Sequence, residues 1–188
     1  PAKNPSVEKL KVKISAAADA MPGVRDVRIA TPQGVSTVGQ LVVVRDAIFS
    51  ETGDNNSISK AQQITIPATV CGAIDATEDV DCFKFNVAAG TSLVFRVWSM
   101  RLEDRIHDLQ EHADPILTIR NAAGGTLVAN DNHFSADPLL FCHFEQPGDY
   151  VLEIRDVRYK GNADWVYAIE VNNRPFITQV TPFVVKPG

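Results

Sequence analysis

Residues 79–99 read DVDCFKFNVAAGTSLVFRVWS, and this stretch indicates two consecutive β-strands. Apolar residues recur at every second position over residues 83–87, and residues 93–98 are largely apolar. A period of two turns one face of a strand toward a core. The small residues 88–90, Ala-Ala-Gly, are typical of a tight turn between them. We therefore expect two strands, over residues 81–87 and 92–99, inside a larger β structure.

Similar short segments continue on both sides of this pair. Further strands are predicted over residues 63–66, 70–74, 116–120, 126–130, 139–144, 148–156 and 165–171. Short strands at this spacing, separated by Gly-rich turns, predict an all-β fold, an antiparallel jelly-roll-like β-sandwich. Residues 100–113 do not show the strand pattern. Leu102, Ile106 and Leu109 have helical spacing there, which predicts one short helix.

The N-terminal region predicts additional strands outside the sandwich. Alternating apolar residues between Val7 and Val44 indicate three antiparallel strands, broken at residues 21–23 and 31–34. Residues 22–34 resemble the later strands of an immunoglobulin-like domain of the TIG type, and the tail from Asn173 resembles the first strand of another. We expect partial immunoglobulin-like strands over residues 1–46, the sandwich over 47–173, and a linker or first strand of a following domain over 174–188.

Composition excludes several classes of partner. The chain has 188 residues, 45% of them hydrophobic, and a net charge of -5. This charge attracts no phosphate backbone, so nucleic acid is excluded as a partner. The longest apolar run, Leu41–Val44, is far too short to cross a bilayer, so no membrane insertion is expected. We expect a piece of a longer protein, with any export signal upstream.

The sequence carries no signature of an enzyme. It has no Gly-x-Ser-x-Gly elbow, no His-Glu-x-x-His motif and no phosphate-binding glycine loop. His107 and His112 are five residues apart and do not share a helix face as metal ligands would. Three cysteines are too few for a disulfide framework. Cys71 and Cys82 could face each other across a hairpin, and buried free thiols are the alternative.

Residues 51–171 resemble the bacterial pre-peptidase C-terminal family through landmarks that occur in order. The first half has an Asn/Asp-rich opening turn (53–56), a strand glycine (72), an Asp-x-Asp-x-aromatic-x-Phe run (79–85) and an Ala-Gly turn (89–90). The second half has an Asp-Pro strand (114–117), an Asn-Asp loop (130–132) and a Gly-x-Tyr strand (148–150). The resemblance implies a non-catalytic, jelly-roll-like accessory module of a secreted or cell-surface bacterial protein. Some members bind calcium and polymers such as collagen or polysaccharide.

Two acidic clusters suggest where calcium would bind. The proposed ligands are Glu51, Asp54, Asn55, Asp79 and Asp81. Calcium prefers six to eight hard oxygen ligands, and a jelly roll can bring the opening turn beside the Asp-x-Asp run. The alternative is that these short acidic side chains only cap turns. Gly53 and Asn56 also stand where calcium-binding members commonly carry Glu and Asp.

A second candidate site is the loop Asp131, Asn132, His133 and Phe134. Polar groups beside an aromatic ring are typical of shallow sugar sites. The alternative is a tight polar turn with Phe134 packed against the sandwich. Trp165 and Tyr167 share one face of the last strand, which favours core or inter-domain packing. The expected partners are an extracellular polysaccharide or matrix protein and neighbouring domains, and the alternative function is a structural spacer.

Overall fold

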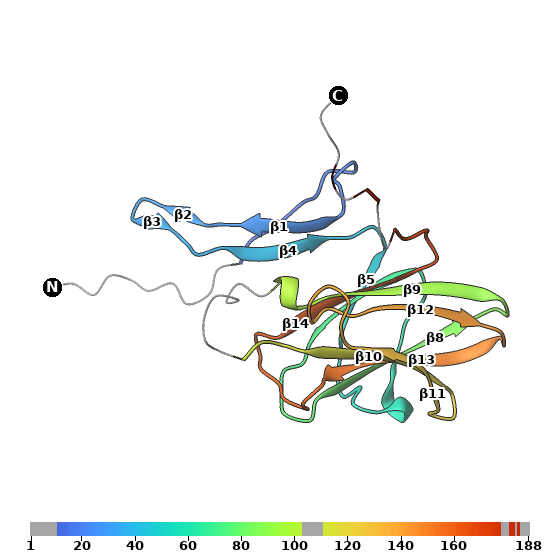
Figure 1. Ribbon diagram of the computed structural model, residues 1–188. Helices are drawn as coiled ribbons and strands as arrows, with labels where there is room; N and C mark the ends of the chain where they lie inside the picture. Colours follow the sequence, from blue (N-terminus) through green and yellow to red (C-terminus); the bar gives the residue numbers. More distant parts are fainter. Residues whose placement is uncertain (1–10, 103–110, 178–180, 183, 185–188) are drawn as a thin grey trace.

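The computed structural model describes residues 11–102, 111–177, 181, 182 and 184. Within these residues a pair of five-stranded sheets packs face to face (Figure 1). The first sheet has the order β12-β9-β14-β7-β5, with strands Leu139–Phe144, Thr91–Trp98, Val166–Asn172, Ala68–Ala73 and Ala47–Ser50. The second has the order β11-β10-β13-β8-β6, with strands Thr126–Asn130, Pro115–Asn121, Gly148–Asp156, Val80–Val87 and Gln62–Gln63. The predicted all-β sandwich is confirmed.

Alternation along the strands builds the core between the two sheets. On β8, Phe83, Phe85 and Val87 are buried on the inner face. The Phe85 ring lies 5.8 Å from that of Phe95 and 5.9 Å from that of Phe144. Rings from both sheets therefore meet at the centre, and such aromatic contacts add stability beyond their buried area.

Two sandwich strands run parallel to their neighbours, a departure from the purely antiparallel expectation. β5 pairs with β7 in parallel, and β6 pairs with β8 in parallel. No strand was predicted at β5, because in this edge strand only Phe49 packs against the core. A single inward side chain leaves too weak a pattern to distinguish the strand from a loop.

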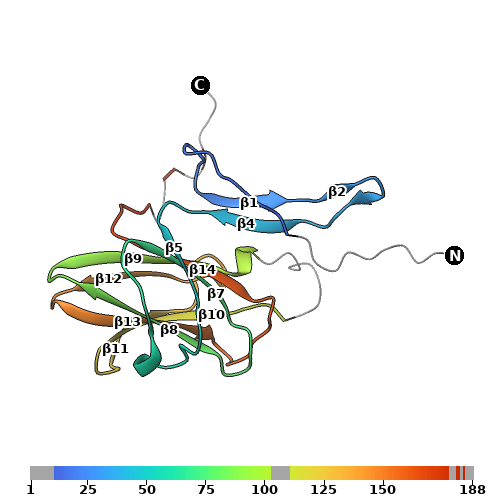
Figure 2. The same ribbon diagram turned by 180° about the vertical axis from the view of Figure 1, so that it is seen from behind.

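The N-terminal region forms a separate two-stranded ribbon above the first sheet (Figures 1 and 2). β1, Gly23–Val27, pairs with β4, Gly39–Val43. At the ribbon's tip β2, Ala30–Thr31, pairs with β3, Gly34–Val35. Of the first predicted strand, residues 7–10 lie outside the described residues, and residues 11–14 form no strand. Val12 and Ile14 are exposed, so no described neighbour buries their apolar face.

The connections differ from the predictions in two places. Where a helix was predicted over residues 100–113, a 3-10 turn, η2, spans Met100–Leu102, and residues 103–110 lie outside the described residues. A second 3-10 turn, η1, spans Ile58–Lys60. Cys71 and Cys82 lie on strands of different sheets, and all three cysteines are free thiols. Across the described ranges no helix is long and apolar enough to cross a membrane.

Candidate functional site

Three carboxylates gather where the opening turn of the sandwich meets the start of β8. Asp79 and Asp81 are buried and Glu51 is half-buried, and we call the three the buried acidic group. Glu51 follows β5, and its Oε2 accepts a hydrogen bond from the Ala73 amide at 3.2 Å. Asp81 points inward from β8, and its Oδ2 accepts one from the Tyr167 hydroxyl at 2.8 Å. Parallel pairing of β5 with β7 thus brings Glu51 to Asp81.

The electrostatics of Asp81 are unfavourable for its charged form. The residue is 0% exposed, and its Oδ1 has no hydrogen-bond partner. Burial, the adjacent Glu51 carboxyl group and the charge of Asp79 together raise the pKa of Asp81 to about 8, although the hydrogen bond from the Tyr167 hydroxyl acts to lower it. Burial also raises the pKa of Asp79. A buried carboxylate surrounded by like charges is stable only if it takes up a proton or gains a cation.

The opening turn is hydrogen-bonded to β8 beside this group. The Asn55 carbonyl accepts a hydrogen bond from the Cys82 amide at 3.1 Å. The Asn55 side chain is buried, at 1% exposure, and neither its oxygen nor its nitrogen has a partner. Asn56 donates to Asp79 Oδ1 at 3.2 Å. Unpartnered buried amides are rare in folded proteins, so Asn55 is a candidate ligand of a bound species.

Asp54, the fifth predicted calcium ligand, lies apart from the others. Its exposed carboxylate forms an ion pair with Lys60. The hydrogen bond from Lys60 lowers the pKa of Asp54. Within the described residues, no three His, Cys, Asp or Glu side chains are placed to hold a metal by themselves. An ion here would therefore also need amide or main-chain oxygens as ligands.

Sequence reasoning missed Tyr167 and Gly72 as members of this region. Tyr167 was assigned to packing, and it does pack in the core together with Trp165, but its hydroxyl also binds Asp81. A Cβ atom on Gly72 would lie under 3.0 Å from both Glu51 Oε2 and the Tyr167 hydroxyl. Only a residue without a side chain lets these two groups approach across β7. The strand glycine was visible in the sequence, but its neighbours were not.

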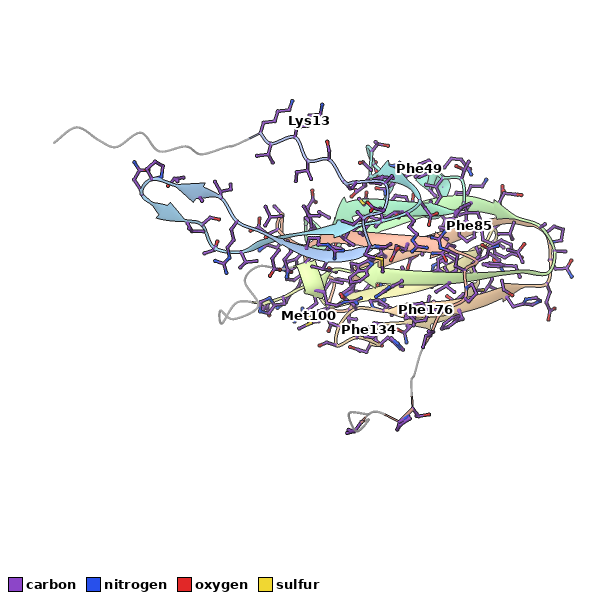
Figure 3. All side chains as sticks on the ribbon, turned by 90° about the horizontal axis from the view of Figure 1, so that it is seen from above. Lys13, Phe49, Phe85, Met100, Phe134 and Phe176 are labelled. Carbon is purple, nitrogen blue, oxygen red and sulfur yellow. The ribbon has the colours of Figure 1, made fainter. Side chains whose placement is uncertain are left out.

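The loop predicted to bind a ligand lies at the surface, near the end of β9. Asn132 and His133 are exposed, Asp131 is half-buried, and Phe134 is 38% exposed. His133 contacts the Phe134 ring edge-on, with 4.5 Å between centroids. Figure 3 shows Phe134 along the same side of the sandwich as Phe176. The Phe134 side chain is therefore only partly packed against its neighbours, and the rest of it is exposed to solvent.

The guanidinium groups of Arg96 and Arg101 contact the Phe134 ring. The guanidinium carbon of Arg101 lies 4.7 Å from the centre of the Phe134 ring, and that of Arg96 lies 5.9 Å from it. Both carbons also lie 4.0 Å from the centre of the Trp98 ring. We call Arg96, Trp98, Arg101 and Phe134 the arginine–aromatic face. Cation–π contacts of this kind fix the rings and the guanidinium groups against one another.

Two buried carboxylates hold this face in place. Asp137 accepts hydrogen bonds from the amides of Ser99, at 2.9 Å, and Met100, at 2.7 Å, and pairs with Arg101. Glu170 accepts one from Trp98 Nε1 at 2.8 Å. Sequence reasoning noted the loop that contains Asp137 but not its role, because the amides that it binds lie on a distant segment.

A further cavity lies on the outer face of the second sheet and was not predicted. It has a volume of about 990 Å³, and η1 and the turn at residues 122–124 form two of its walls. On its floor Arg120 pairs with Glu153 at 2.6 and 2.8 Å, and Lys84 pairs with Asp149 at 2.7 Å. These charges compensate each other, so the floor has no unpaired charge among them.

Cys82, which also lines this cavity, has an inert thiol. Burial raises the pKa of Cys82 to about 12, with a further contribution from the carboxylates of Glu153 and Asp81. The thiolate is the nucleophilic form of cysteine. Cys82 therefore stays protonated at neutral pH and supplies no nucleophile.

Comparison with known proteins gave structural likeness only. No family model matches the chain, and no curated protein matches it. The chain is similar to the pre-peptidase C-terminal domain of a collagenase from Bacillus anthracis, with 16% identity, a TM-score of 0.45, and coverage of 60% of this chain and 94% of that one. It is also similar to PliG, a periplasmic inhibitor of g-type lysozyme from Aeromonas hydrophila, with 9% identity, a TM-score of 0.37, and coverage of 68% and 100%.

Proposed function

We propose that the sandwich is a non-catalytic binding module of a larger secreted or cell-surface protein, and that it binds an extracellular polymer, a glycan or a matrix protein. The arginine–aromatic face carries this proposal. Partly exposed aromatic rings beside fixed polar groups are typical of recognition surfaces, because the ring supplies contact area and the polar groups supply specificity.

The face is ordered before any ligand arrives. Arg101 is held by Asp137 and also donates to the Val97 carbonyl at 2.7 Å. Because side chains that are already fixed lose little entropy on binding, their contacts contribute more fully to affinity. A spacer domain has no need of an exposed ring held in this way, which favours binding over the spacer alternative.

Binding assays on a glycan array and on immobilised collagen test this proposal. We expect the protein to bind one of these polymers, and Phe134→Ala to weaken that binding by about tenfold or more. Leu127→Ala is the matched control, since Leu127 is an exposed apolar residue on the other sheet. If the protein binds neither surface, even at millimolar glycan, polymer binding is wrong and the spacer function is the remaining alternative.

Calcium would support the fold at the buried acidic group. The orphaned Asp81 Oδ1 and the unpartnered side chain of Asn55 fit a hard cation, together with the carboxylates of Glu51 and Asp79. The ion would supply the positive charge that neutralises these carboxylates. Asp81 would then need no proton to remain buried.

Thermal unfolding with calcium or with a chelator tests the cation. An ion that binds only the folded state stabilises it by about 2.7 kcal/mol at a hundredfold excess over its dissociation constant. We expect Asp81→Asn to lose this response and Asp54→Asn to keep it, because Asp54 pairs with Lys60 at the surface. Equal melting curves of the wild type with calcium and with chelator would refute the calcium site.

A further inference from the structure

A cavity with aromatic side chains in its lining lies on the outer face of the first sheet, across Arg96 from the loop of Phe134. It has a volume of about 520 Å³, and β9, β12 and residues 173–176 line it. This volume falls within the range of about 300–1,000 Å³ that is common for small-ligand sites. Phe141 lies on its floor with 51% of its surface exposed, and the Phe176 ring lies 6.0 Å away at 64°.

The polar side of this cavity is also fixed. His143 and Ser92 lie directly opposite each other on β12 and β9. Ser92 Oγ lies 2.8 Å from His143 Nδ1, so this hydrogen bond sets the orientation of the imidazole. Nε2 is then the ring nitrogen left to hydrogen-bond a ligand. One cavity thus combines apolar rings with an oriented polar group.

The segment that carries Phe176 is held against the sheet from both sides. Arg174 forms a bidentate ion pair with Asp46, the residue just before β5. The guanidinium carbon of Arg96 lies 5.5 Å from the centre of the Phe176 ring. These contacts hold residues 174–176, which form one wall of the cavity, in position without a bound ligand.

The geometry points to a binding site for a neutral pyranose sugar between Phe141, Phe176 and His143. A pyranose presents a flat face of C–H groups that packs on an aromatic ring, and hydroxyl groups at its edge that pair with imidazole and hydroxyl side chains. The ligand is neutral, because Asp46 already compensates Arg174 and Glu170 lies beside Arg96. These opposite charges offset one another, which disfavours a charged ligand.

The site deepens the polymer binding proposed above and rests on it. Arg96 contacts the rings of both Phe134 and Phe176, so it joins the arginine–aromatic face to the new cavity. The arginine–aromatic face and the new cavity lie next to each other on the first sheet. Two adjacent sites of this kind suit an oligosaccharide better than a single sugar. A polymer that lies over Phe134 would therefore place another of its sugars on Phe141.

Titration with cellohexaose, maltohexaose and chitohexaose, followed by amide NMR shifts and calorimetry, tests the site. We expect one of these neutral oligosaccharides to shift the amides of residues 139–144 and 173–176. Phe141→Ala and His143→Ala should each weaken its binding by about tenfold, whereas Leu127→Ala should not. Because Phe141 and His143 are exposed, both variants should keep the wild-type melting temperature.

The outcomes separate the site from the proposed function. If an oligosaccharide binds and Phe134→Ala weakens it while Phe141→Ala and His143→Ala do not, the new site is wrong and polymer binding stands. If no hexaose binds but collagen does, the pyranose site is also wrong, and a matrix protein is the ligand. If neither binds, both proposals fail.

Discussion

Gly72 lies on β7 at the point where Glu51 and the Tyr167 hydroxyl approach each other most closely. Its missing side chain leaves the space in which these two groups sit beside Asp81. A methyl group there would overlap with both, and the Tyr167 side chain is buried in the core, where it has little room to move.

We predict that Gly72→Ala destabilises the protein by about 1–3 kcal/mol, because the added Cβ atom overpacks a buried region. Gly39→Ala is the control, since its Cβ would meet only the Val27 carbonyl oxygen at an ordinary 3.8 Å. Urea unfolding of both variants measures the difference. A Gly72→Ala variant as stable as the wild type would mean that Glu51 can leave Asp81 at no cost.

Asp156 gives the protein a defined acid sensitivity. Its side chain is 0% exposed and accepts hydrogen bonds from the amides of Asp114, Arg158 and Lys160 at 3.0, 2.8 and 3.2 Å. Burial acts to raise the pKa of Asp156, but these bonds and the Arg158 guanidinium outweigh it, so the pKa is lowered. The folded state therefore holds this proton less tightly than the unfolded state does.

We predict that Asp156 stabilises the fold above about pH 4, the pKa of an unfolded aspartate, and that this contribution disappears as the pH falls through the lower folded pKa. Asp156→Asn should cost roughly 1–3 kcal/mol at neutral pH and flatten the loss of stability in acid. Urea unfolding at a series of pH values measures both effects. Wild-type and variant curves that stay parallel down to about pH 2 would contradict this role.

At the scale of elements, one ion pair connects the chain that enters the sandwich to the chain that leaves it. Asp46 precedes β5, and Arg174 follows β14. Both strands pair with β7, from opposite sides, so β5 depends on this pair and on its parallel ladder for its place at the sheet edge. Edge strands with few buried contacts are the first to open.

We predict that Arg174→Ala speeds amide hydrogen exchange in β5, Ala47–Ser50, while lowering global stability by less than about 1 kcal/mol. The guanidinium is partly exposed, which limits the contribution of the pair to the whole fold. Lys60→Ala, which breaks the exposed pair with Asp54, is the control and should leave exchange in β5 unchanged. Unaltered exchange in Arg174→Ala would show that the ladder to β7 alone holds β5.

At the scale of the whole molecule, the sandwich contains its own core. The buried apolar cluster runs from Ile64 to Val171, with Phe49 packed against it, and no residue of the ribbon β1–β4 belongs to it. A two-stranded ribbon by itself is only marginally stable in water. The ribbon therefore depends on its surroundings more than the sandwich depends on the ribbon.

We predict that a chain of residues 46–177 folds alone, with one cooperative transition and a melting temperature within about 5 °C of that of the full chain. Calorimetry and near-UV circular dichroism measure this. The full chain under the same buffer is the control. A non-cooperative or aggregated product would mean that the ribbon is needed to cover the outer face of the first sheet.

The sequence by itself determined the strands of the sandwich. Alternation on β8 and the turn at residues 88–90 are local signals, because a side-chain period of two follows from strand geometry alone. The predicted strands over residues 81–87, 126–130, 139–144 and 148–156 match β8, β11, β12 and β13 within a residue. It also identified Asp81, Asn55 and Phe134 as residues with chemical content.

Only the tertiary structure decided which of these residues meet. Glu51 reaches Asp81 because a four-residue strand pairs in parallel with β7, and Asp54 turns out to solvent beside Lys60. Arg96 joins Phe134 to Phe176 because β9 lies between β12 and β14. Strand order and parallel pairing are long-range properties that leave no periodic trace in the chain, since they depend on which segments close the core.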